Sequence, residues 1–210
     1  MTEDKSELPE EDIEEYIEEY IEEYASIRSI VSEALPFEIV CALGGVVAGI
    51  ILFGMVDEIA SIAGLLVIVP AVMGMRGNIS CALGSRLGSA IHMGLITKIE
   101  RNPELTNNII ASLTLSLIMA IVLGLAGHYV SIFLGLPSQG PLILVSIAVI
   151  SGLVSGIILA GVAVLLATAA FRFGVDPDNI VTPAIGTIGD IVTMLLIFAS
   201  AKVVIWLFIV

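Results

Sequence analysis

A chain of 210 residues that is 58 % hydrophobic and 14 % charged, with a mean hydropathy of +1.08, is too apolar for a water-soluble domain. The net charge of −13 is concentrated at one end, because residues 1–38 hold 14 acidic and two basic residues, whereas residues 39–210 hold seven acidic and six basic residues. We therefore expect an acidic cytoplasmic tail over residues 1–35 and a transmembrane domain over residues 36–210, with membrane lipid around it and no nucleic-acid partner. Cys41 and Cys81 lie in apolar segments, which favours buried thiols over a disulfide or a CxxC metal site.

The acidic tail contains a short repeat in which isoleucine and tyrosine recur at i, i+3, i+4 and i+7 over residues 13–24, with glutamate on the other face. This pattern predicts an amphipathic acidic helix, which anionic lipids would repel. Two interpretations stay open: a solvated helix that packs on a copy of itself or on the membrane domain, and a sensor whose glutamates bind divalent cations. The acidic start has no basic region before an apolar stretch, so we expect no cleavable signal peptide.

Apolar segments long enough for a transmembrane helix, which needs about 20 residues, follow the tail. The second of them is too long for one straight span, and Pro70, Gly74 and Gly77 predict a break or bend near Arg76 and Asn78. The expected fold is an all-α membrane protein of five transmembrane helices, with a broken or long second helix and an acidic amphipathic helix before the first. The five segments are 37–56, 59–96, 105–134, 141–171 and 179–210.

The basic residues of the short loops predict the orientation in the membrane. Lys98, Arg101 and Arg172 would face the same side as the acidic tail, whereas the loops at 57–60 and 135–140 carry no lysine or arginine. Since cytoplasmic loops are enriched in these residues, the N-terminus is expected in the cytoplasm and the C-terminus outside the cell. The expected location is the cell (plasma) membrane.

Asp190 stands alone inside the apolar fifth segment. A charge near the middle of a bilayer costs roughly 2.5–3.5 kcal/mol on translocon scales, so such a residue usually faces water or a partner and marks an ion path. Pro183, Gly186 and Gly189 precede it within two turns, and they thin the helix surface and free backbone carbonyls. A carboxylate beside free carbonyls predicts a cation site, and the alternative is an interhelical hydrogen bond.

Four further residues are candidates for the same site. Asn78 offers an amide oxygen at a pore mouth, or it caps a helix broken at Gly77. Thr182 is expected to support a carbonyl near the ion. Asp176 and Asp178 form either an acidic mouth or an ordinary turn and N-cap.

The remaining features of the membrane segments have structural interpretations. Arg76 and Arg86 suit a cation site poorly, and we expect them to reach the membrane interface or to pair with Asp176, Asp178 or lipid phosphate. Small residues recur where helices are expected to pack closely. They are Gly44, Gly45 and Gly49 in the first segment and Gly152, Gly156 and Gly161 in the fourth.

Two sequence elements carry a resemblance to a known family. The second segment contains Pro70-Ala-Val-Met-Gly-Met-Arg-Gly-Asn78, and the fifth contains Asn179-Ile-Val-Thr-Pro183 followed by Gly189-Asp190. In these elements and their order, residues 37–210 resemble the MgtE-type magnesium transporters and are similar to one half of their eukaryotic solute-carrier relatives. The resemblance implies divalent cation transport, with Mg²⁺ as the transported ion, through a pore between two five-helix halves. It also implies that Asp190 and the carbonyl of Gly186 line that pore.

The chain departs from this family in two respects. The large soluble magnesium-sensing region of the bacterial members does not precede the membrane domain, so their gating is not transferred here. Only one membrane half is present, so a homodimer or a sister half is expected to complete the pore. Mg²⁺ suits such a site because it prefers oxygen ligands and retains several waters.

Two other functions are alternatives, a non-catalytic membrane assembly protein and an intramembrane aspartyl protease. Gly189-Asp190 matches half of the Gly-x-Gly-Asp element of those proteases, but Thr187 stands where the first glycine is required. A second intramembrane aspartate is also missing. We expect no enzyme and no organic cofactor.

Overall fold

The computed structural model describes residues 26–96, 102–173 and 177–208, and these residues form helices and no strand. The chain divides into two compact units, residues 1–39 and 40–210, which are described separately. In the first unit the described part is the beginning of helix α2 (Ile27–Gly54), where Ile27, Val31 and Leu35 are exposed. The acidic amphipathic helix expected over residues 13–24 lies outside the described residues.

Five of the described helices are long and apolar enough to cross a membrane, as the sequence predicted. The candidate spans are Ala34–Gly54, Leu65–Ile91, Pro103–Phe133, Pro141–Arg172 and Val181–Phe208. After α2 the helices are α3 (Val56–Ser61), α4 (Leu65–His92), α5 (Pro103–Phe133), α6 (Pro141–Phe173) and α7 (Pro177–Phe208).

The sequence sets the ends of these helices through proline, asparagine and glycine. Helices α5, α6 and α7 each begin at a proline, which has no N–H to leave unpaired in the first turn. Asn102 caps α5, because its side-chain oxygen accepts from the N–H groups of Glu104 at 2.9 Å and Leu105 at 3.2 Å. Gly94 follows α4 with a φ of 72° and Gly135 follows α5 with a φ of 69°, the left-handed conformation that closes many helices.

The break expected near Arg76 and Asn78 is absent, because α4 runs through both residues without interruption. The long second segment divides earlier, at residues 62–64, where α3 ends and Gly64 adopts a φ of 90°. A glycine inside an apolar span stays helical, since breaking the helix would leave backbone N–H and C=O groups unpaired. Pro70 lies near the start of α4, so only one early carbonyl loses its donor.

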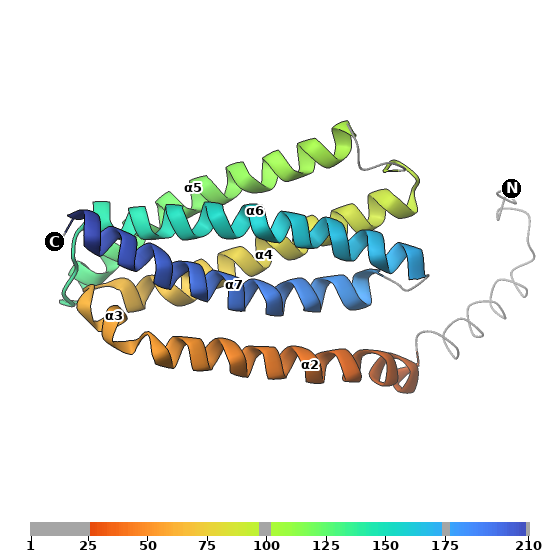
Figure 1. Cartoon of the computed structure of the whole chain (residues 1–210), viewed down its shortest axis with the longest axis horizontal. Coiled ribbons are helices and arrows are strands. Elements are labelled where there is room, and N and C mark those ends of the chain that lie inside the picture. The colour runs from red at the N-terminus through yellow and green to blue at the C-terminus, as the bar shows by residue number, and fades with distance from the viewer. Residues whose placement is uncertain (1–25, 97–101, 174–176, 209–210) are drawn as a thin grey trace, which may run out of the picture. The chain divides into compact units, whose positions relative to one another are not determined.

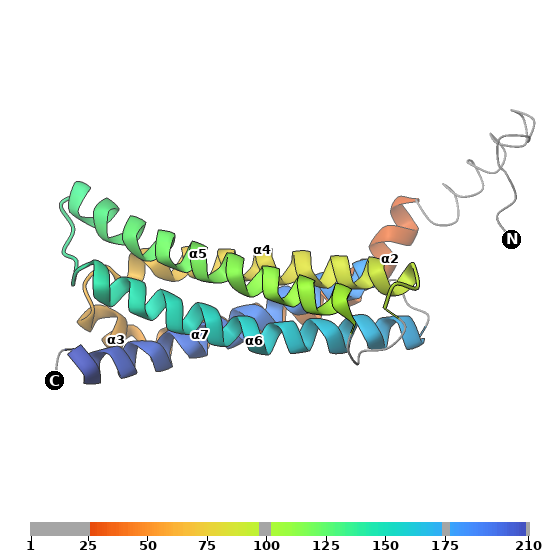
Figure 2. The same ribbon diagram turned by 90° about the horizontal axis from the view of Figure 1, so that it is seen from above.

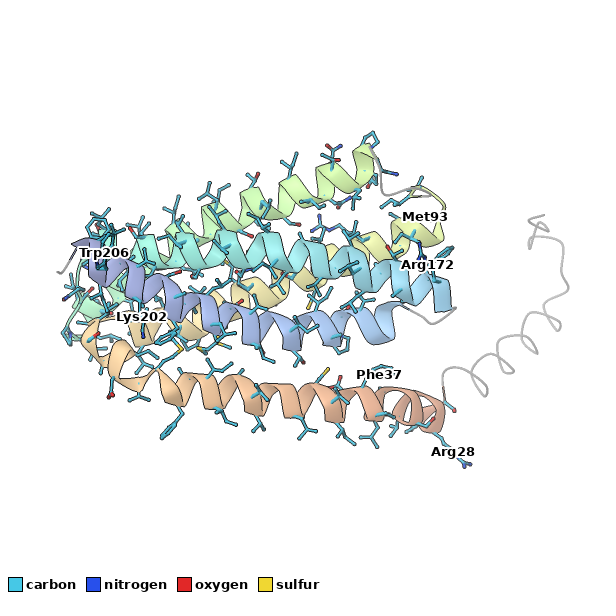
Figure 3. All side chains as sticks on the ribbon, viewed as in Figure 1. Arg28, Phe37, Met93, Arg172, Lys202 and Trp206 are labelled. Atoms are coloured by element: carbon cyan, nitrogen blue, oxygen red, sulfur yellow. The ribbon has the colours of Figure 1, made fainter. Side chains whose placement is uncertain are left out.

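Helices α4 to α7 form an antiparallel bundle with α4 and α6 at its centre (Figures 1 and 2). Helix α4 packs against α5, α6 and α7, and α6 also packs against α5 and α7. Met93 and Arg172 lie at one end of the bundle, and Lys202 and Trp206 lie at the other (Figure 3). The arrangement sets α7, which carries Asp190, directly beside α4, which carries Asn78.

Two apolar clusters fill the bundle and leave a polar layer between them. The first cluster reaches Ile79 on α4 and begins at Met194 on α7, and the second begins at Leu83 on α4 and ends at Ile185 on α7. Most of the buried polar side chains lie at the level between the clusters, and we call these residues the polar layer. They are Arg76, Ser80, Ser112, Ser116, Ser151, Ser155 and Thr193.

Glycines allow the closest helix contacts. A Cβ placed on Gly124 of α5 would lie 2.5 Å from the Cα of Val145 on α6, so the two backbones approach too closely for any side chain there. Gly152 on α6 faces Ala120 at an ordinary 3.5 Å. At Gly161 a Cβ would meet no atom of the described chain within 4 Å, and the same is true of Gly45 and Gly49, so close packing is absent at three of the six glycines proposed for it.

Gly124→Ala should therefore destabilise the bundle, whereas Gly161→Ala should not. The added methyl meets the α6 backbone, which must move, and overpacking of this kind costs about 1–3 kcal/mol. The measurement is the thermal unfolding midpoint of each purified variant in one detergent. Equal midpoints for Gly124→Ala and Gly161→Ala would contradict the close α5–α6 contact.

Candidate functional site

Asp190 lies well inside the span of α7. It follows the start of that span, Val181, by nine residues, which places it about 14 Å along the helix axis. The side chain is half-buried, and within the described part of the chain its carboxylate makes neither a hydrogen bond nor an ion pair. The structure therefore offers no interhelical hydrogen bond inside the chain to explain the carboxylate, which is costly at this depth.

One face of α7 turns into the bundle, and the neighbouring face stays partly open. Val181, Ile185 and Gly189 are buried, and a Cβ on Gly189 would lie 3.5 Å from Leu159 of α6. The open face carries three of the predicted site residues at i, i+4 and i+8, all of them half-buried. They are Thr182, Gly186 and Asp190.

Helix α4 completes this open face. The Cys81 thiol on α4 donates to the Thr182 carbonyl at 3.4 Å, and a Cβ on Gly186 would lie 3.9 Å from the same sulfur. Since α4 and α7 are antiparallel, Asn78, about one turn before Cys81, lies level with Asp190, one turn after Gly186. Asn78 is exposed. We call Asn78, Cys81, Thr182, Gly186 and Asp190 the α4/α7 stripe.

Not every candidate residue joins the stripe. The alternative role of Asn78 as a helix cap is wrong, because residue 78 lies in the middle of the continuous α4 and has no terminus to cap. Asp178 lies in the first turn of α7, but its side chain is outside what the structure describes, and Asp176 lies outside altogether. The acidic mouth therefore stays a prediction.

Pro183 lacks the N–H that would bond the carbonyl of residue 179, four residues before it. It therefore frees that carbonyl and does not free the carbonyl of Gly186.

The described part of one chain does not assemble a metal cage. It contains no group of three or more His, Cys, Asp or Glu side chains that could hold a metal ion. The stripe offers one carboxylate, one amide oxygen and backbone carbonyls, which are hard ligands of the kind that Mg²⁺ prefers. The described residues of one chain would thus leave most of the coordination positions of a cation at Asp190 to other ligands.

Arg76 lies on the inward side of α4, and the expectation that it reaches the membrane interface is wrong. The side chain is 2 % exposed. Its Nη1 donates to the Ser116 hydroxyl on α5 at 2.7 Å and to the Gly152 carbonyl on α6 at 2.8 Å, and its Nη2 donates to the Ser80 hydroxyl at 3.4 Å. These oxygens accept hydrogen bonds from both terminal nitrogens of the guanidinium, which is therefore held inside the bundle and does not extend to the interface. Arg86, by contrast, is exposed, and its Nε donates to the Ala82 carbonyl at 3.1 Å.

Three buried polar atoms in the polar layer have no hydrogen-bond partner in the described residues: Arg76 Nε, Ser112 Oγ and Thr193 Oγ1. A buried donor or acceptor left unpaired costs about 1–3 kcal/mol. The sequence did hold a signal for this layer, because Ser112 and Ser116 on α5, and Gly152 and Gly156 on α6, each recur at i, i+4 on a face that can meet a polar side chain. The layer therefore costs stability, as functional polar sites in membrane proteins do.

Comparison with known proteins points to one family. Residues 69–200 match the MgtE family, described as a divalent cation transporter. The chain is 30 % identical over 182 residues to solute carrier family 41 member 2 of Xenopus laevis, an alignment that covers 81 % of the chain and 31 % of that protein. It is 33 % identical over 138 residues to the Homo sapiens member 2, covering 61 % and 23 %. Member 3 of Rattus norvegicus is 30 % identical over 136 residues, covering 62 % and 29 %. The chain thus spans less than a third of the length of these relatives. The region that matches the family, residues 69–200, includes Asn78 and Asp190.

If the α4/α7 stripe faces water, cysteines on it should react with a membrane-impermeant maleimide. In a background carrying Cys41→Ser and Cys81→Ser, Asn78→Cys and Thr182→Cys should be labelled at least about tenfold faster than Ile79→Cys, whose position is buried. The measurement is the labelling rate of protein in liposomes. Equal rates at positions 78 and 79 would contradict the orientation of α4, and no labelling at 78 or 182 would show that the stripe faces lipid.

Proposed function

Because the chain belongs to the MgtE family of divalent cation transporters, we propose that it carries divalent cations, principally Mg²⁺, across the cell membrane. The observation that supports this most directly is Asp190, an unpartnered carboxylate on a half-open face inside a span. The family consists of transporters and not of enzymes, which removes the protease alternative. In addition, the described spans contain no second aspartate for that chemistry.

The proposed path runs between two five-helix halves that face each other across the α4/α7 stripe. One half supplies a single carboxylate at this level, and two facing copies of Asp190 would supply a charge of −2 opposite an ion of +2. Gly74 and Gly77 on α4 have no atom of the described chain within 4 Å of a Cβ, and Gly186 has only an ordinary contact. Packing inside the described chain thus does not require glycine at these positions. The absence of side chains there leaves room for an ion or for the surface of a second half. The second half is a copy of this chain or a sister half.

The stripe suits a hydrated Mg²⁺ better than a dehydrated one. Mg²⁺ sheds water reluctantly and is usually bound by one or two carboxylates with several waters retained. Asp190 offsets the ion's charge, while Asn78 and the Gly186 carbonyl accept hydrogen bonds from its waters at the same level. Thr182 contributes indirectly, because its carbonyl already accepts from Cys81 at 3.4 Å. Asp176 and Asp178 would raise the local cation concentration at the entrance to the path.

The orientation follows from the charged ends of the bundle. The end that carries Met93 and Arg172 faces the cytoplasm in this proposal, because the basic residues of the neighbouring loop lie there in the sequence (Figure 3). Lys202 and Trp206 lie at the opposite end, and both are exposed. Side chains of these two types anchor a helix at the lipid–water interface.

Asp190→Asn should reduce Mg²⁺ flux into liposomes by at least about tenfold, because the amide preserves the shape but removes the charge that offsets ion dehydration. Asp57→Asn is the matched control, since Asp57 is an exposed aspartate in α3 outside the spans, and its flux should equal that of wild type. Both variants should elute as folded protein in size-exclusion chromatography. Wild-type flux in Asp190→Asn would contradict the proposed function.

Two facing halves also predict a contact between equivalent residues. Asp190→Cys should crosslink to its own copy with a short bifunctional thiol reagent, or jointly bind Cd²⁺, more readily than Leu196→Cys, which is almost two turns further along α7. Added Mg²⁺ should slow thiol modification at position 190, because the ion and its waters occupy the same space. Stronger crosslinking at 196 than at 190 would place the two-fold axis elsewhere.

A further inference from the structure

We propose that Arg76 is a fixed positive charge that weakens cation binding at Asp190, so that a bound divalent ion can leave the path. The inference rests on the proposed function, because it concerns the affinity of that same site. It assigns a role to a residue whose hydrogen bonds go to Ser80, Ser116 and Gly152, and which acts on the stripe through its electric field.

The guanidinium occupies a site that the neighbouring helices are shaped to hold. Helix α6 has glycine at position 156, where a Cβ would lie 2.8 Å from Nη1 of Arg76, so any larger residue would displace the charge. Three oxygens accept its hydrogen bonds: the hydroxyls of Ser116 and Ser80 and the carbonyl of Gly152. Since α4, α5 and α6 all contribute, the charge is held at a fixed position.

The guanidinium has no counter-ion among the described residues, because each of its hydrogen bonds goes to an uncharged oxygen. An isolated buried charge is expensive, and packing alone would be served as well by an apolar side chain of similar volume. Its field is also not cancelled locally. In a protein interior the field of a unit charge reaches further than it does in water, where salt screens it within about 10 Å.

Helix α6 places this charge near the level of Asp190. Arg76 lies against Gly156, and Leu159, one turn further along α6, lies against Gly189, the neighbour of Asp190. The charge and the carboxylate are therefore about one turn apart along the bundle axis. The guanidinium lies toward α5 and α6, and the carboxylate lies on the partly open face of α7. In a pair of halves, two such guanidinium groups offset the two carboxylates and oppose a bound cation. Conduction requires that an ion bind tightly enough to enter and weakly enough to leave. Arg76 meets the second requirement because its charge weakens the binding.

The experiment compares charge with packing. Mg²⁺ affinity of the full-length protein in detergent is measured by calorimetry, and half-saturation is measured by flux into liposomes. Arg76→Met removes the charge, and Ser116→Asp keeps Arg76 but places a carboxylate against it. Both should lower the Kd for Mg²⁺ by roughly tenfold, the order expected for charges a helix diameter apart at the effective dielectric of a protein. Maximal flux should fall in both because release becomes slower.

The matched controls keep the charge or remove one elsewhere. Arg76→Lys retains the charge, so its Kd should stay within about twofold of wild type. Ser116→Asn changes the same position without adding a charge and should shift the Kd little. Arg172→Met removes an exposed arginine at the end of α6, some 13 residues from Leu159, and should leave the Kd unchanged. In Arg76→Met, the binding free energy should change more for the trivalent hexaamminecobalt(III) ion than for Mg²⁺, in the ratio of the two ion charges.

An unchanged or higher Kd in Arg76→Met, or an Arg76→Lys that behaves like Arg76→Met, would overturn the inference and leave Arg76 as a packing residue. If Arg76→Met does not fold, Ser116→Asp against Ser116→Asn decides the question. The proposed function fails separately, if Asp190→Asn still binds and conducts Mg²⁺ as wild type does. Loss of binding in Asp190→Asn with no shift in the Arg76 variants would overturn this inference alone.

Discussion

A guanidinium buried inside a bundle that crosses a membrane has only the protein to supply its hydrogen-bond acceptors, and in Arg76 both terminal nitrogens have one. In this chain that requirement explains several features at once. Ser116 on α5 and Gly152 on α6 supply acceptors, and Gly156 leaves the space. The two apolar clusters end on either side of this level, so the bundle consists of two apolar regions with the polar layer between them. Arg76 therefore links α4 to both α5 and α6.

The same helix serves both sides of the polar layer. Residues 76 and 78 are two positions apart on α4, which turns their side chains to roughly opposite faces of the helix. Arg76 points into the bundle and fixes the rotation of α4, and Asn78 consequently lies on the open face beside α7. The hydrogen bond from Cys81 to the Thr182 carbonyl is one of the contacts between α4 and α7 that accompany this register. The geometry of the stripe thus depends on contacts made away from it.

The sequence was sufficient to predict the five spans, since apolar length alone identifies them, and it shows that the fifth span carries a single carboxylate. It was insufficient for Arg76, because apolar neighbours in the sequence do not reveal oxygens contributed by other helices. The prediction of a break in α4 was wrong for a related reason. Gly74 and Gly77 lie on the outward side of an unbroken helix, where composition cannot distinguish a glycine that bends a helix from one that leaves room beside it. The level shared by Asn78 and Asp190 required the antiparallel register, which only the fold supplies.

The directions of the helices constrain how two such halves can be joined. From Val40 onward α2 runs the same way as α7, opposite to α4 and α6 (Figure 1). Any segment that crosses a membrane five times starts on one side and finishes on the other. Two halves of equal orientation, written one after the other in a single polypeptide, would need an odd number of additional crossings between them. Separate chains related by a two-fold axis along the membrane normal need none. In the proposed pair, the parity of the spans thus requires a tandem version to add a crossing that separate chains do not need.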